Sequence, residues 1–260
     1  MKPEFKTFAE DFAKRAGAIM KKNFSLGMAK EWKSDTTPLT ETDTLINSML
    51  IQEIREKFPT HSVKGEEESD IKENSQYLWV CDPVDGTIPF SHGLPISTFL
   101  LALVLDGESI LGVVYDPFMD RLYSAAKGEG AFLNGSPISV STSTALKATA
   151  AAYEHFETAA YDISEVAEKL THMGVKMMKL CSIGYASALV AAGELSFTIF
   201  PHMTAHDAAA FSVLIKEAGG VFTDLFGNEQ RYDREIKGYI ASNVVLHPQL
   251  VELVKECGVR

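Results

Sequence analysis

The sequence has no long apolar run, and nowhere do its 260 residues approach the ~20 consecutive apolar residues that a membrane-spanning helix needs. Its first 22 residues alternate charged with apolar side chains and lack the apolar core of a signal peptide. Cysteine is scarce as well, because Cys81, Cys181 and Cys257 are odd in number, lie far apart and have no metal-ligand spacing. We therefore expect no membrane partner, no disulfide framework, free thiols and a cytoplasmic location.

Basic residues are also few. Lysine and arginine total 24 against 35 acidic residues, and the formal net charge is −11. A surface of this sign repels nucleic-acid backbones and anionic lipids, so we expect no nucleic-acid polymer as a partner. The 46% of hydrophobic and 23% of charged residues are ordinary for a folded soluble chain and exclude disorder. A phosphate substrate would need local charge compensation, which a bound divalent cation can supply.

Hydrophobic periodicity predicts an α+β first half, with two helices followed by a meander of strands. The predicted helices span residues 5–19 and 43–58, with a loop at 32–38 between them. The predicted strands span residues 76–82, 96–105, 109–116 and 121–126, with turns at 106–107, 117 and 134–135.

After about residue 145 strands and helices alternate, which is typical of an α/β unit. The predicted strands span residues 148–153, 176–180, 196–200 and 238–242. The predicted helices span residues 161–173, 183–192, 207–218 and 248–257. We therefore assign the chain to the α/β class and divide it into halves at 1–144 and 145–260.

The sharpest motif follows the first predicted strand, where residues 82–87 read Asp-Pro-Val-Asp-Gly-Thr. Pro83 cannot donate a ladder hydrogen bond, so strand pairing should be interrupted there, and Gly86 permits a tight backbone path beside a ligand. Two carboxylates three residues apart on a rigid turn can converge on hard cations, with backbone carbonyls as further ligands. A helical turn starting near Gly86 would add free N–H groups that suit a phosphate. The alternative is an ordinary solvated turn, because these residue types are common in turns.

Further acidic segments accompany this motif. Residues 65–68 read Gly-Glu-Glu-Glu, Asp43 stands at the start of the second predicted helix, and Asp207 opens a later one. Each has a plain structural alternative, because a charge run is usually solvated and an aspartate at a helix start is a common N-cap. The glycines at 219–220 are likewise typical of a helix end.

Together these segments resemble the inositol monophosphatase family of lithium-sensitive, metal-dependent phosphatases. The family pattern is Gly-Glu-Glu, a strand with Trp before Asp-Pro-x-Asp-Gly-Thr, and Trp-Asp-x-Ala followed by Glu-Ala-Gly-Gly. It is matched in order at residues 65–67, 79–87, 206–209 and 217–220, and further matches lie at Phe90, 112–117 and 128–135. The resemblance covers nearly the whole chain and implies a layered α-β-α-β-α sandwich with the site between the halves.

The resemblance also implies roles for single residues. The implied metal ligands are Glu66, Asp82, Asp85, Asp207 and the backbone carbonyl of Val84. The implied catalytic residues are Glu66 together with Asp43 and Thr87, which match positions that orient and deprotonate the attacking water. The implied phosphate and substrate contacts are Asp85, Gly86, Thr87, Gly184, Tyr185, Ala186, Phe200 and Asp207. Lys33 falls near a position that the family often fills with lysine.

The chain departs from the family pattern in the substrate pocket. His206 stands where the family usually has Trp, and with His202 and Asp207 it leaves a His-His-Asp metal site open, the alternative being a packed histidine. Phe200 stands where inositol phosphatases carry a Glu that contacts ring hydroxyls, and Tyr185 replaces a smaller polar residue. We therefore expect a more apolar leaving-group side and a less specific preference for inositol.

Hydrolysis of a phosphate monoester needs an in-line water and charge compensation but no nucleophilic side chain. Two or three Mg²⁺ ions can activate the water and stabilise the leaving alkoxide, and Asp43 acting through Thr87 offers a proton path. We predict a Mg²⁺-dependent phosphoric monoester hydrolase with inositol 1-phosphate as its default substrate. Histidinol phosphate, fructose 1,6-bisphosphate and a 3′-phosphonucleotide are the alternatives.

Two further expectations rest on the resemblance alone, namely inhibition by Li⁺ and a homodimer. The rival from another class is a non-catalytic, metal-binding regulatory protein. The complete set of matched acids together with Thr87 argues against it.

Overall fold

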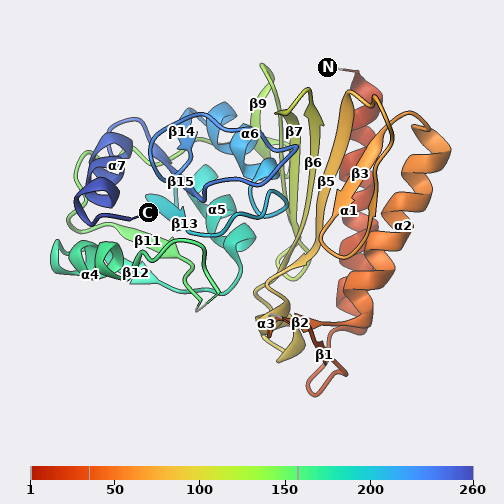
Figure 1. The fold of residues 1–260 in the computed structure, drawn as a ribbon, viewed down its shortest axis with the longest axis horizontal. Helices are drawn as coiled ribbons and strands as arrows, with labels where there is room; N and C mark the ends of the chain where they lie inside the picture. The colour runs from red at the N-terminus through yellow and green to blue at the C-terminus, as the bar shows by residue number, and fades with distance from the viewer. Residues whose placement is uncertain (1, 35, 157, 260) are drawn as a thin grey trace.

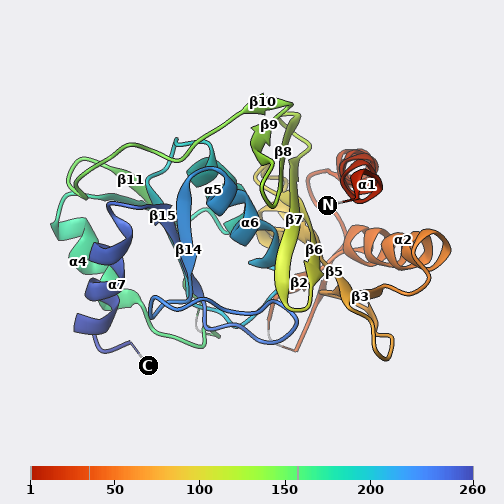
Figure 2. The ribbon, with the colours of Figure 1, turned by 90° about the horizontal axis from the view of Figure 1, so that it is seen from above.

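The computed structural model describes residues 2–34, 36–156 and 158–259, and its elements stack in alternating layers of helices and sheet. Helices α1 and α2 cover the outer face of the first sheet, α5 and α6 lie between the two sheets, and α4 and α7 cover the outer face of the second (Figures 1 and 2). The predicted α-β-α-β-α sandwich is therefore confirmed. The helices are α1 (Pro3–Asn23), α2 (Glu41–Lys57), α3 (Thr87–Ser91), α4 (Ser164–His172), α5 (Ile183–Ala191), α6 (Ala209–Glu217) and α7 (His247–Glu256).

The first two helices form where the sequence predicts them. In α1 the buried residues Phe5, Phe8 and Phe12 recur at helical spacing and pack against the sheet. α2 begins with a capping box, in which Thr40 is the N-cap and Asp43 occupies the third helical position. The simple N-cap interpretation of Asp43 is therefore wrong, because Thr40 takes that position.

The first sheet runs in the order β10-β9-β8-β7-β6-β5-β3-β4. Strands β5 to β8 form the predicted meander and β9 and β10 extend it, all antiparallel, while β3 pairs parallel with β5. Short strands β3, β4, β9 and β10 were not predicted, and the loop at 32–38 is bounded by the strand pair β1–β2. The strands are β1 (Glu31–Trp32), β2 (Pro38–Leu39), β3 (Ser62–Gly65), β4 (Ser69–Asp70), β5 (Tyr77–Asp85), β6 (Thr98–Leu105), β7 (Glu108–Asp116), β8 (Arg121–Ala126), β9 (Gly130–Leu133) and β10 (Ser136–Pro137).

Strand β5 continues past its predicted end at residue 82 and carries a β-bulge there. Asp82 lies opposite Leu100 whereas Asp85 lies opposite Thr98, so β5 holds one extra residue between these two pairs. This is the interruption of pairing that Pro83 predicts. The chain then turns at Gly86, whose φ of 78° is in the left-handed region, and α3 begins at the next residue as predicted.

The second sheet runs in the order β12-β11-β13-β15-β14 and is reached from β10 through residues 138–149, which cross the top of the molecule in Figure 2. Its strands are β11 (Ala150–Tyr153), β12 (Lys176–Met178), β13 (Phe197–Phe200), β14 (Gly220–Thr223) and β15 (Tyr239–Asn243). β11 is parallel to β12 and β13, while β15 is antiparallel to β13 and β14. The interpretation of residues 219–220 as a plain helix end missed β14, which begins at the second of these glycines.

The start of α6 bears on the site. The helix begins at Ala209, so Asp207 lies in the turn that precedes the helix and does not open it. Throughout the described ranges, no helix is both long and apolar enough to cross a membrane.

Candidate active site

Three carboxylates from both halves of the chain converge between the end of β5 and the start of α6. Asp82, Asp85 and Asp207 each offer an oxygen atom, and these three atoms lie within 4.8 Å of one another. Asp82 and Asp85 are buried, and Asp207 is half-buried. Among the residues that the structure describes, no lysine or arginine forms an ion pair with any of the three. Because buried carboxylates are normally paired or bound to a metal, this donor set fits a hard divalent cation.

The pKa values of the two buried aspartates also favour a bound cation. Burial raises the pKa of Asp82 well above its usual range, and the negative charges of Glu66 and Asp207 add to this effect. Burial likewise raises the pKa of Asp85 to about 6, although hydrogen bonds from Ser182, Gly184 and Thr98 oppose it. A divalent cation reverses this preference because it stabilises the ionised form of each carboxylate.

Asp85 is held in place by residues from both halves of the chain, Thr98 on β6 and Ser182 at the start of α5. The hydroxyl groups of Thr98 and Ser182 both donate to Asp85 Oδ2, the former over 2.7 Å. A Cβ atom on Gly184 would lie 2.5 Å from the same oxygen, so this position requires a residue without a side chain. Sequence reasoning included Gly184 but missed Ser182 and Thr98, because their patterns indicate only a helix N-cap and a strand residue.

Asp43 and Thr87 also meet, as the resemblance implies. Thr87 Oγ1 lies 3.3 Å from Asp43 Oδ1 and 2.9 Å from the carbonyl oxygen of Val84. Burial raises the pKa of Asp43 to about 7, although the hydrogen bond from Thr40 opposes it. A carboxylate with a pKa near neutrality can accept a proton through the threonine hydroxyl. The Val84 carbonyl keeps a second lone pair for another partner.

Glu66 lies beside the three clustered aspartates but outside their group of metal-ligand atoms. Its Oε1 accepts a hydrogen bond of 2.9 Å from Lys33 Nζ, and the same ammonium reaches Glu67 Oε1 at 2.5 Å. Burial lowers the pKa of Lys33, but the charges of Glu66 and Glu67 outweigh this and raise it overall. Lys33 therefore offsets part of the negative charge next to the aspartates.

The predicted substrate contacts lie around the same centre. Gly184 and Ala186 are buried in the first turn of α5, and Tyr185 is half-buried between them in the chain. Phe200 ends β13, where its ring packs against Tyr239 and His202 at centroid distances of 5.1 and 5.0 Å. Phe200 is only 4% exposed, so it acts mainly as a core residue.

The two histidines take separate positions. His206 Nε2 lies 3.5 Å from Asp207 Oδ2, and the Thr204 hydroxyl donates to the same oxygen. His202 packs against Phe200, and across the described residues neither histidine belongs to a cluster of metal-ligand atoms. A His-His-Asp cluster is therefore not formed, and the structure instead shows a packed His202 and a His206 that contacts Asp207.

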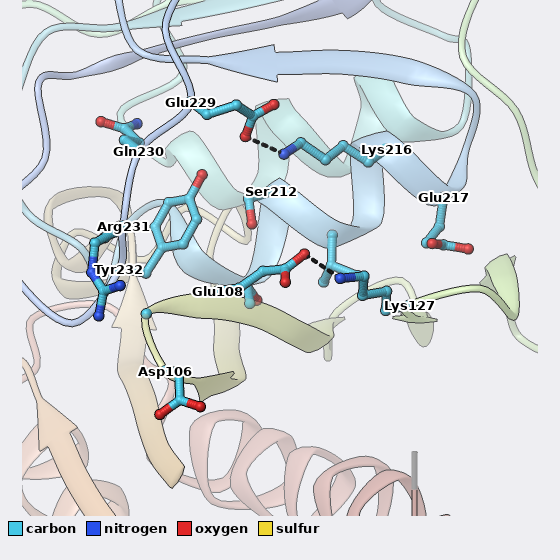
Figure 3. A pocket seen from close by; sticks show the side chains of 13 residues that line it. Asp106, Glu108, Lys127, Ser212, Lys216, Glu217, Glu229, Gln230, Arg231 and Tyr232 are labelled. Atoms are coloured by element: carbon cyan, nitrogen blue, oxygen red, sulfur yellow. Dashed lines mark hydrogen bonds and ion pairs between the residues drawn. The ribbon is translucent and has the colours of Figure 1, made fainter. Parts of the chain in front are cut away.

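A cavity of about 330 Å³ lies elsewhere, along the C-terminal part of α6 and the turn between β6 and β7 (Figure 3). Four of its charged side chains form ion pairs with each other, Lys127 with Glu108 and Lys216 with Glu229, each over 2.6 Å. It contains none of the clustered aspartates, so we place the chemistry at the aspartates and not in this cavity.

Comparison with known proteins agrees with this geometry. Residues 1–258 match the inositol monophosphatase family. A fructose-1,6-bisphosphatase/inositol-1-monophosphatase from Thermotoga maritima is 36% identical over 218 residues, which cover 84% of this chain and 82% of that protein. Inositol monophosphatase 1 from Solanum lycopersicum is 33% identical over 97% of this chain and 95% of its own length. A histidinol-phosphatase from Chlorobaculum parvum is 30% identical over 95% of each.

Solved structures of inositol monophosphatases share the fold of this chain. An IMPase from Thermotoga maritima superposes with a TM-score of 0.87 at 31% identity, covering 96% of both chains. An inositol monophosphatase from Anabaena superposes with a TM-score of 0.84 at 26% identity, covering 97% of this chain and 96% of the other. The chain therefore belongs to the inositol monophosphatase family and is a hydrolase of phosphate monoesters.

Proposed function

We propose that this phosphatase works with Mg²⁺ held by Asp82, Asp85 and Asp207, and that it hydrolyses a small phosphate monoester by direct attack of water. The observation that supports the proposal is the convergence of these three carboxylates without a lysine or arginine partner among the described residues. Their oxygen donors are the type that Mg²⁺ prefers. Glu66 and the Val84 carbonyl are proposed as additional ligands.

The protein's own residues have separate tasks in this proposal. Bound Mg²⁺ supplies charge compensation for the phosphate and lowers the pKa of water at the site. Thr87 orients the attacking water with its hydroxyl and passes the proton to Asp43, to which it is hydrogen-bonded. The backbone N–H groups of Gly86 and Thr87, where α3 begins, bind phosphate oxygens. Ser182 and Thr98 hold Asp85 in a single orientation.

The proposed substrate is inositol 1-phosphate. Two of the relatives described above carry inositol monophosphatase in their names. Fructose 1,6-bisphosphate remains a candidate because the Thermotoga maritima relative is also named for it, and histidinol phosphate because the Chlorobaculum parvum relative is named for it. A 3′-phosphonucleotide is the fourth candidate. In each case the leaving group occupies the space beside Gly184, Tyr185 and Ala186.

The remaining proposals concern the whole protein. We propose that residues 1–144 and 145–260 form the two walls of the site. This division falls within residues 138–149, which connect the two sheets. We further propose a cytoplasmic homodimer that is inhibited by Li⁺, on the resemblance to the family.

Phosphate release by the purified protein tests the proposal. The panel is inositol 1-phosphate, histidinol phosphate, fructose 1,6-bisphosphate and 3′-phosphoadenosine 5′-phosphate, each with Mg²⁺ and with EDTA. We expect release from at least one ester with Mg²⁺ and none with EDTA. Equal rates with Mg²⁺ and EDTA contradict the proposal.

A further inference from the structure

Glu154 is a buried carboxyl group without a task in the mechanism described above. It follows β11 directly, only 2% of it is exposed, and neither of its oxygens has a side-chain hydrogen-bond partner among the described residues. Burying a carboxyl group without hydrogen bonds costs a folded protein free energy. A buried polar group of this kind calls for a partner that is present when the protein works.

The strand pattern places this carboxyl group on the side of the active site. Ala151 packs toward α4 and α7, Ala152 packs toward α5 and α6, and successive strand residues alternate between the two faces. Glu154, two residues after Ala152, therefore points toward α5 and α6. The parallel register pairs Tyr153 with Ile199, which brings Glu154 beside Phe200 at the carboxyl ends of their strands.

Electrostatics agree with this placement. Burial raises the pKa of Glu154 to about 8, and the charges of Asp85 and Asp207 raise it further, whereas Lys179 and the backbone N–H of Cys181 lower it. Glu154 therefore lies within electrostatic reach of two clustered aspartates, yet it does not belong to their group of metal-ligand atoms.

We propose that Glu154 is a specificity-determining residue, and that its carboxyl group binds hydroxyl groups of a polyhydroxylated leaving group. This inference rests on the proposed phosphatase function and identifies the substrate class of the same site as cyclitol and sugar phosphates. It adds a polar group to the leaving-group side, for which Phe200 and Tyr185 alone predict an apolar surface.

Hydroxyl groups suit this carboxyl group better than a cationic amine does. A carboxyl group accepts hydrogen bonds from hydroxyls in either protonation state, and in its neutral form it also donates one. An ammonium group gains most from the ionised form, which burial disfavours at this position. Lys179, which donates to the backbone carbonyl of His155, already supplies positive charge nearby.

The test measures discrimination between leaving groups with and without hydroxyls. Glu154→Leu removes both oxygens at similar volume, and Glu154→Gln keeps the shape with a neutral amide. Values of kcat/KM are measured with Mg²⁺ for myo-inositol 1-phosphate, histidinol phosphate and phenyl phosphate. Glu168→Leu is the matched control, because Glu168 is an exposed glutamate on the neighbouring helix α4. Thermal unfolding verifies that each variant is folded.

In Glu154→Leu we expect the ratio of kcat/KM for inositol 1-phosphate to that for phenyl phosphate to fall at least tenfold, mostly through KM. In Glu154→Gln the same ratio should fall by less. If the leucine variant does not fold, the ratio in Glu154→Gln tests the inference. The control should keep the wild-type ratio.

Three results overturn the inference. The first is an unchanged ratio, which means that only water binds the carboxyl group. The second is an equal loss for both esters, which indicates a structural role, and the third is a larger loss for histidinol phosphate than for inositol 1-phosphate. The proposed function stands in all three cases, as long as one ester shows Mg²⁺-dependent release of phosphate. Absence of Mg²⁺-dependent release from any ester contradicts the proposed function itself.

Discussion

The hydroxyl group of Ser182 donates a hydrogen bond to Asp85 Oδ2, across 97 positions of the sequence. Ser182 is the N-cap of α5 and also accepts a hydrogen bond from the N–H of Tyr185, so the same side chain fixes the helix start and the carboxylate. The orientation of Asp85 therefore depends on how the second half of the chain packs against the first.

Replacing Ser182 with alanine should weaken the metal site without unfolding the protein. Loss of a side chain that orients a metal ligand costs about 10–100-fold in metal affinity or activity. We expect a fall of this size in kcat/KM and a higher Mg²⁺ concentration for half-maximal activity. Ser164→Ala is the control, because Ser164 is exposed at the start of α4. Wild-type Mg²⁺ dependence in folded Ser182→Ala contradicts the assigned role.

Gly184→Ala should disturb the same carboxylate by steric contact. The new Cβ atom would lie 2.3 Å from Thr98 Oγ1 and 2.5 Å from Asp85 Oδ2, so these atoms must move. Overpacking of this kind costs about 1–3 kcal/mol of stability. We expect a lower urea midpoint and a loss of activity. Gly128→Ala serves as a control for crowding, because no atom lies within 4 Å of its added Cβ, although its φ of 80° strains the backbone. Full activity in Gly184→Ala would falsify the close approach of Gly184 to Asp85 and Thr98.

Asp85→Asn should abolish turnover and leave the fold intact. The amide keeps the shape of the carboxylate but removes a charge that the proposed Mg²⁺ site requires. We expect activity to fall by more than about 100-fold, since metal ligands matter at least as much as the residues that orient them. The stability gained on adding Mg²⁺ should shrink as well. Calorimetric titration with Mg²⁺ and thermal unfolding measure both effects, and near-normal activity in a folded variant disproves the assignment.

The buried side chain of His247 should make the free energy of unfolding depend on pH. Burial lowers its pKa from the ordinary 6.5 to about 4, and its ring nitrogens lie 2.9 Å from the hydroxyls of Thr223 and Ser242. Its contribution is complete above pH 6.5. As the pH falls toward 4 the unfolded chain binds a proton that the folded protein does not, so the contribution decreases by at most about 1.4 kcal/mol per pH unit.

His247→Gln isolates this effect from the acidic groups, which titrate in both proteins. We expect the variant to be less stable than wild type at pH 8, and the difference in free energy of unfolding to shrink as the pH falls from 6.5 to 4.5. Urea unfolding at pH 8, 6 and 5 measures it. A difference that stays constant over this range contradicts the assigned pKa shift.

The sequence by itself determined the elements whose signals are local. The spacing of Phe5, Phe8 and Phe12 sets the buried face of α1 whatever the rest of the chain does. Pro83 predicts the interruption of β5, because proline lacks the N–H group that the ladder needs. The acidic residue types likewise indicate hard cations, since that preference belongs to the carboxylate itself.

Only the tertiary structure decided which of these residues meet. Strand β3 enters the first sheet parallel to β5, and Glu66, directly after β3, is held by Lys33 beside the aspartates instead of among them. The register of β11 with β13 brings Glu154 beside Phe200, although the two are distant in sequence. Such contacts depend on which strands pair and how the sheets stack. No local pattern carries that information, because each strand residue could face several partners until the whole core has packed.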